Sequence, residues 1–163
     1  MEGIITRIAG PVVHAKISGA VNDMVKVGDL ELMGEIIEVR GEECLIQVYE
    51  ETSGLVPGEK VTNTKKPLSV TLGPGILGGV FDGTQRPLKV IKEQSGTFIT
   101  RGVNVNQLDT NKVWNFKALV KSGDEVKPGQ IIGEVEENPL ITHKILVPPK
   151  VSGKIKNIES GEF

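Results

Sequence analysis

Short apolar runs separated by turn-forming residues fill the first seventy positions of the chain. The runs predict strands at residues 3–8, 11–17, 30–39, 44–49, 60–63 and 68–72. The breaks between them are rich in Gly, Pro and acidic residues, which is typical of tight turns. Within 44–49, Ile46 and Val48 face one side of the predicted strand and Gln47 faces the other. About six short strands favour a small closed β-barrel over residues 1–72, because closure leaves no unpaired edge.

The pattern changes after this region. Residues 73–79 are glycine-rich, and a helix is predicted at 87–94, with Pro87 at its first position and Gly96 as its stop. Leu88, Ile91 and Val90 are the candidates for its apolar face. Residues 100–111 are polar. We therefore expect 73–111 to be a lead-in or linker that carries one short helix.

Strand signals return in the last third of the chain. Runs at 113–120, 130–135, 143–147 and 154–158 alternate with turns that contain Gly, Pro or Asn. They predict a second small β module at 112–163 that ends before its fold is complete. The expected fold class is mainly β: a small closed N-terminal β-barrel and a second small β module that resembles a barrel-sandwich (lipoyl-like) fold, joined by the glycine-rich lead-in with its one short helix.

Composition narrows the class of protein. With 38% hydrophobic and 25% charged residues, the 163-residue chain resembles a globular protein. Its net charge of -2, without long runs of either sign, argues against a mainly electrostatic nucleic-acid binder. The single cysteine, Cys44, lies in an apolar run and is interpreted as a buried reduced thiol. No apolar stretch approaches the ~20 residues that span a bilayer, so we expect an intracellular chain without membrane insertion.

The glycine-rich segment is the first candidate for chemistry. Residues 73–78 match the start of a phosphate-binding loop, but Gly79 and Val80 stand where Lys and Ser or Thr should follow. Pro74 also removes one backbone N–H that could bind a phosphate. The segment is therefore interpreted as a linker.

The remaining candidates give no active site either. His14 and His143 have no metal-ligand spacing, and adjacent carboxylates at 42–43 and 50–51 would point to opposite faces of a strand. Trp114 and Phe116 share one face of a predicted strand and are assigned to a core or an interface. We assign no catalytic, cofactor-binding or metal-binding residue in this chain.

The order of several segments resembles a known family. They are residues 10–13 (GPVV), 34–41 (GEIIEVRG), 47–55 (QVYEETSGL), 67–70 (PLSV), 73–77 (GPGIL) and 80–88 (VFDGTQRPL). In this order they closely resemble the catalytic A subunit of archaeal and vacuolar-type rotary ATPases. The resemblance covers the whole chain and is most specific across residues 34–88.

The resemblance implies a role for each region. Residues 1–72 would form the barrel that joins its neighbours in a crown, 73–111 would lead into the nucleotide-binding domain, and 112–163 would open the bulge insertion. The implied partners are the B subunits of the A3B3 headpiece and, through the bulge, the peripheral stalk. The Mg-ATP site of the full-length parent would lie beyond Phe163, so this fragment is expected to be inactive alone, cytoplasmic and peripheral to the membrane. The coupling ion, H⁺ or Na⁺, stays open.

Two other functions remain as alternatives. Residues 120–132 (VKSGDEVKPGQII) resemble the first turn of lipoyl or biotinyl carrier domains, with Lys144 as the candidate modified lysine, although its flanking residues differ from both patterns. Residues 1–72 could also be an oligonucleotide-binding barrel. The acidic balance and the scarcity of aromatic residues argue against that function.

Overall fold

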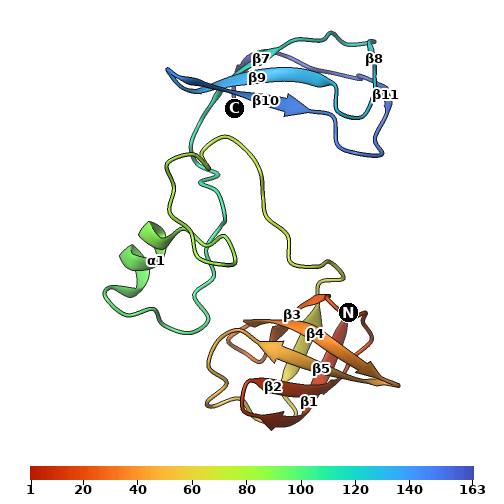
Figure 1. Ribbon diagram of the computed structural model, residues 1–163, viewed down its shortest axis with the longest axis vertical. Coiled ribbons are helices and arrows are strands. Elements are labelled where there is room, and N and C mark those ends of the chain that lie inside the picture. The colour runs from red at the N-terminus through yellow and green to blue at the C-terminus, as the bar shows by residue number, and fades with distance from the viewer. The chain divides into compact units, whose positions relative to one another are not determined.

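The chain folds into two compact units. The computed structural model describes residues 1–163 (Figure 1). The first unit comprises Met1–Val70 and Phe81–Val105, and the second comprises Thr71–Val80 and Asn106–Phe163. Each unit is therefore built from two separate stretches of sequence.

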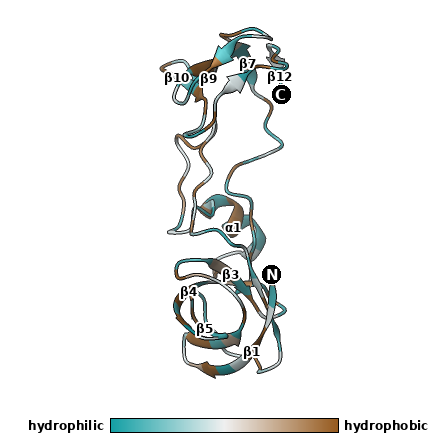
Figure 2. Cartoon of the chain, turned by 90° about the vertical axis from the view of Figure 1, so that its right-hand side faces the viewer, coloured by the Kyte–Doolittle hydropathy of each residue, from teal (hydrophilic) through white to brown (hydrophobic).

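The first unit contains a closed six-stranded antiparallel barrel. Its strands are β1 (Glu2–Ala9), β2 (Val12–Lys16), β3 (Met24–Val27), β4 (Leu32–Arg40), β5 (Glu43–Val48) and β6 (Lys60–Asn63). They are hydrogen-bonded in the order β1-β2-β5-β4-β3-β6, and β6 returns to β1. Figure 2 shows this ring nearly end-on. Pairing shifts by one residue after Ile5 in β1 and after Ile36 in β4, and such bulges increase the strand bending that closure requires.

The barrel core follows the alternation of apolar residues along the strands. In β5, Cys44, Ile46 and Val48 are buried while their neighbours are half-exposed, which confirms the facing predicted for this strand. The Cys44 thiol donates a hydrogen bond to the carbonyl of Ile17 at 3.1 Å. Burial raises the pKa of this thiol, so it stays protonated and packs as a small apolar group. The core residues are Ile5, Val13, Ala15, Ile17, Val25, Val27, Leu32, Ile36, Cys44, Ile46, Val48 and Val61.

One predicted barrel strand is wrong, and one strand of the barrel is not among those predicted. Residues 68–72 form no strand, and the side chains of Leu68, Val70 and Leu72 are exposed. The physical reason is closure: β6 already pairs with β1 and β3, so the barrel has no edge for a further strand. The barrel still has six strands because β3, a four-residue segment beside the turn at Gly28, takes part in it although the sequence pattern did not predict it.

The single helix, α1, spans Leu88–Ser95, and one short helix is confirmed. The helix begins at Leu88, one position after the predicted start, so Pro87 stands at the N-cap and not at the first helical position. Gly96 ends the helix with φ 75°. Ile91 is buried, whereas Val90 is exposed and does not belong to the packed face. The helix has eight residues, and the chain has no helix long and apolar enough to cross a membrane.

The second unit is a small β structure. A four-stranded sheet has the order β10-β9-β7-β12, and β11 pairs with β8. Phe116 packs over Gly133, where any added side chain would overlap its ring. Of the predicted strand at 154–158, only Lys154 lies in a strand, at the end of the two-residue β11. The bounds are β7 (Asn115–Ala118), β8 (Glu125–Val126), β9 (Ile131–Asn138), β10 (Ile141–Leu146), β11 (Gly153–Lys154) and β12 (Gly161–Glu162).

Neighbouring isoleucines in β1 provide a matched test of the barrel core. Ile5 is 1% exposed, whereas Ile4 is 52% exposed on the opposite face. We expect Ile5→Ala to lower the free energy of unfolding by about 2–5 kcal/mol, because it leaves a cavity in the closed core. Ile4→Ala should cost less than about 1 kcal/mol. Urea denaturation followed by circular dichroism measures both, and equal losses would contradict the inward facing of Ile5.

Candidate functional site

A turn built around Asp82 forms the centre of the candidate site. Oδ1 of Asp82 accepts hydrogen bonds from the Thr84 amide at 2.9 Å, the Thr84 hydroxyl at 3.0 Å and the Arg86 amide at 2.8 Å. Asp is suited to such turns because its short side chain reaches the main chain two residues on. These bonds fix the conformation of residues 82–86 immediately before α1.

Arg86 connects this turn to the barrel. Its Nε donates to Oδ2 of Asp82 at 2.7 Å, and its Nη1 lies 3.2 Å from both Oε1 of Glu50 and the carbonyl oxygen of Val103. The three charged side chains are only 15–21% exposed. Since a planar guanidinium donates in several directions at once, one arginine joins three segments that are distant in sequence.

Glu50 completes the arrangement from the loop that follows β5. Its Oε2 accepts a hydrogen bond from the Gly102 amide at 2.8 Å. Gly102 has φ 70°, and a Cβ there would lie 2.8 Å from the Leu30 carbonyl oxygen, so the close approach requires glycine. We call Glu50, Asp82 and Arg86, together with the backbone groups of residues 102–103, the Arg86 clamp.

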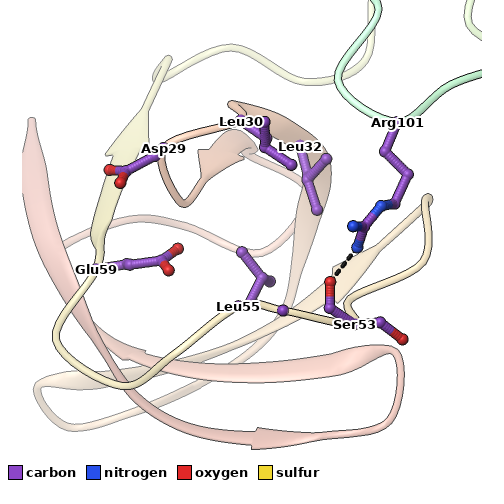
Figure 3. Close-up of a pocket in the computed structure, with 8 residues that line it drawn as sticks. Asp29, Leu30, Leu32, Ser53, Leu55, Glu59 and Arg101 are labelled. Carbon is purple, nitrogen blue, oxygen red and sulfur yellow. Dashed lines mark hydrogen bonds between the residues drawn. The ribbon is translucent and has the colours of Figure 1, made fainter.

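A second arginine holds the same barrel loop. The Arg101 guanidinium donates to the carbonyl of Ser53 and, at 3.4 Å, to that of Glu51. Arg101 is one of the residues that line a hollow of about 210 Å³, and Figure 3 shows its guanidinium pointing toward Ser53. The hollow is lined by Asp29, Leu30, Leu32, Ser53, Gly54, Leu55, Glu59 and Arg101. Residues 81–105 therefore dock on the loop at 50–54 through two arginines.

The electrostatics of the clamp favour a positioning role. Burial by itself would raise the pKa of the Asp82 carboxyl, but hydrogen bonds from the Arg86 amide, the Arg86 guanidinium and Thr84 outweigh it and lower the pKa. Arginine remains protonated at physiological pH, and both carboxylates accept main-chain N–H groups. The arrangement is therefore suited to holding chain segments rather than transferring protons.

The residues considered as candidates in the sequence lie elsewhere. Nδ1 of His14 is 3.6 Å from Oε2 of Glu43, and Nδ1 of His143 is 3.4 Å from Oε2 of Glu137. No group of three or more His, Cys, Asp or Glu side chains could hold a metal ion. In the glycine-rich loop, the Gly75 amide donates to Glu137.

The structure also places the residues behind the two alternatives. Lys144 lies within β10 opposite Glu134, away from the hairpin turn at 139–140 where a carrier domain would display a modified lysine. Tyr49 is the only Phe, Trp or Tyr in residues 1–72, and its hydroxyl donates to Glu35 at 2.8 Å. Burial, followed by this bond to a carboxylate, raises the pKa of Tyr49 to about 12. Neither arrangement favours the alternative function that motivated it.

Sequence reasoning about individual residues does not find the clamp. In the sequence Glu50 is only half of an adjacent carboxylate pair, and Arg86 is only part of a motif. The available signal is the family resemblance itself: segments 47–55 and 80–88, which carry it, meet at the ion pair between Glu50 and Arg86. No local pattern states that these two segments are in contact.

Two family models match this chain, one over each β module. The "ATP synthase alpha/beta family, beta-barrel domain" matches residues 5–65, and the "ATPsynthase alpha/beta subunit barrel-sandwich domain" matches residues 105–163. The chain is 54% identical over 164 residues to the V-type ATP synthase alpha chain of Thermoanaerobacter sp., covering 99% of this chain and 28% of that protein. It is 57% identical over 162 residues to the A subunit of the A-type ATP synthase of Thermoplasma volcanium, covering 98% of this chain and 21% of that protein.

A solved structure has a similar fold. The assembled ATPase EscN, in complex with its central stalk EscO from the type III secretion system of enteropathogenic E. coli, matches with a TM-score of 0.50 and 23% identity. The match covers 52% of this chain and 21% of that one.

Fold and comparisons together define a β-barrel protein with a following barrel-sandwich module, as the sequence predicts. The chain belongs to the ATP synthase alpha/beta family, and its relatives there are the A subunits, or alpha chains, of A-type and V-type ATP synthases, which confirms the resemblance. It spans about a quarter of the length of these relatives.

The clamp can be tested by removing its only cation. Arg86→Met leaves the largely buried carboxylates of Asp82 and Glu50 facing each other without a positive charge. We expect the free energy of unfolding to fall by about 2–3 kcal/mol, less than for a fully buried pair. Hydrogen exchange of residues 81–105 should also become faster. The control is Arg40→Met, which removes an exposed ion pair with Glu38 and should change little. Equal effects in urea denaturation would contradict the clamp.

The lowered pKa of Asp82 predicts that the stability of the folded protein depends on pH. The folded protein lowers the pKa of the Asp82 carboxyl below 3.8, its ordinary value in an unfolded chain. The ionised carboxylate therefore contributes fully to stability above pH 3.8. The contribution is lost as the pH falls through the lower folded pKa. The stability difference between the wild type and Asp82→Asn should therefore shrink as the pH falls below 3.8. Urea midpoints from about pH 2 to pH 6 measure this difference. A difference that stays constant over that range would contradict the assignment.

Proposed function

We propose that this chain is the scaffold and docking region of an A subunit in an A-type or V-type rotary ATP synthase. The observation that carries the proposal is the Arg86 clamp, which joins two of the segments that carry the family resemblance, 47–55 and 80–88, and fixes residues 81–105 on the barrel. A region that joins a barrel to following domains needs such fixed geometry. Two arginines and a buried Ile91 supply it here.

Each region has a proposed part in the assembly. Residues 1–72 would form the crown barrel and contact B subunits of an A3B3 headpiece. Residues 73–111 would lead into the nucleotide-binding domain, and 112–163 would belong to the bulge, which contacts the peripheral stalk. The identity of 51–57% to A subunits along nearly the whole chain supports these roles.

Catalysis is proposed to belong to other parts of the parent subunit. There Mg-ATP turnover would be coupled to H⁺ or Na⁺ movement at the membrane, with this region peripheral to the bilayer on its cytoplasmic side. The glycine-rich loop has Gly79 and Val80 in place of the Lys and Ser or Thr of a phosphate-binding loop. Its Gly75 and Leu77 amides already donate to a carboxylate, which supports a scaffold role for this segment.

Two measurements on the purified chain test the function. We expect no Mg-dependent ATP hydrolysis above the background measured with EDTA, because the residues that bind phosphate and magnesium are missing from the loop. We also expect co-elution with a purified B subunit of the same source on size exclusion. Hydrolysis that depends on magnesium would contradict the scaffold role. Separate elution of the two proteins would contradict the proposed contact of the barrel.

A further inference from the structure

Residues 71–80, which we call the glycine strap, belong to the second unit although twenty-five residues of the first unit follow them. Figure 1 draws this segment in yellow-green. The strap has no helix or strand of its own. Its first residue, Thr71, donates from both its amide and its hydroxyl to Oε1 of Gln107. Two further amides of the strap converge on one side chain, that of Glu137.

Glu137 lies in β9 with a side chain that is 4% exposed. Its Oε1 accepts hydrogen bonds from the amides of Gly75 at 2.7 Å and Leu77 at 3.2 Å. Its Oε2 is buried and makes no hydrogen bond, with Nδ1 of His143 3.4 Å away. A buried carboxylate is costly unless donors or cations compensate it. The strap amides are therefore essential partners of Glu137.

The strap directs two of its backbone amides, those of Gly75 and Leu77, to one carboxylate oxygen. Gly75 has φ 100° and Gly78 has φ 81°, conformations that glycine adopts without strain. A turn that contains left-handed residues can direct several N–H groups toward one point and create a concave site for an anion. Here the point of convergence is Oε1 of Glu137.

We propose that Glu137 is a built-in anion that occupies the amide site of the glycine strap, and that this contact docks the strap on the second unit. Without the Glu137 carboxylate, the amide site should accept a small free carboxylate in its place. This inference concerns the second unit alone and does not depend on the proposed function of the chain.

Trp114 provides a direct readout of strap docking. It is the only tryptophan in the chain, and a Cβ placed on Gly75 would lie 3.3 Å from Cζ2 of its ring. Nζ of Lys112 lies 3.9 Å from the ring centroid. Release of the strap would uncover the part of the ring beside Gly75. Fluorescence quenching by acrylamide therefore reports on the docked state.

The first experiment compares Glu137→Ala with Glu136→Ala in the full 163-residue chain. Glu136 carries the same charge in the same strand, but it is exposed, so it is a matched control. For Glu137→Ala we expect the quenching constant of Trp114 to rise about twofold and thermolysin to cleave at Ile76 or Leu77 about tenfold faster. Glu136→Ala should leave both unchanged. Unchanged values for Glu137→Ala, or equal changes in both variants, would overturn the proposal.

A second measurement separates the anion role from simple packing. Sodium acetate, but not sodium chloride at equal ionic strength, should restore the shielding of Trp114 in Glu137→Ala, because acetate supplies the missing carboxylate. Glu137→Gln keeps one acceptor oxygen and should lie between the wild type and Glu137→Ala. Failure of acetate to restore shielding would assign the effect to lost packing and overturn the proposal. Loss of amide protection throughout β9 and β10 in Glu137→Ala would also overturn it, since Glu137 would then hold the whole sheet.

Discussion

Closure of the six-stranded barrel is the constraint on which the first unit depends. Each strand has two hydrogen-bonded neighbours only because β6 pairs with β1 as well as with β3. This closed ladder turns one face of every strand inward, and the alternating apolar residues fill the interior. It also leaves no edge for the apolar residues at 68–72, which are exposed, and it holds the loop at 50–54 in a fixed place after β5.

That fixed loop allows a short stretch with a single helix to dock firmly. Residues 81–105 contribute one buried side chain from α1, Ile91, so polar contacts carry much of their attachment. Arg86 is effective because its guanidinium satisfies two carboxylates and a carbonyl oxygen simultaneously. Since the charges are mostly removed from water, the loss of one partner would leave the others uncompensated. The clamp therefore specifies one arrangement of three chain segments.

The second unit also holds a segment without regular secondary structure in place, but it has a smaller hydrophobic core. Its buried hydrophobic residues are Val126, Val135 and Val147, and Phe116 covers Gly133 at the centre of the sheet. A core of this size gives little hydrophobic stabilisation, so individual polar contacts matter more. The glycine strap and Glu137 are one such contact. In both units, a largely buried carboxylate accepts main-chain amides from a segment that has no sheet to join.

Sequence alone determined the mainly β class, the strand alternation of β5, the buried thiol of Cys44 and a short helix that ends at Gly96, because each depends on local periodicity or on one residue's conformational preference. Only the tertiary structure decided which apolar runs become strands, since 68–72 and β3 differ in whether the closed barrel offers them a partner. The tertiary structure alone also decided that Arg86 pairs with Glu50 and that the strap amides bind Glu137. These contacts join residues 36 and about 60 positions apart, so they depend on how the chain folds back and leave no periodic pattern in the sequence.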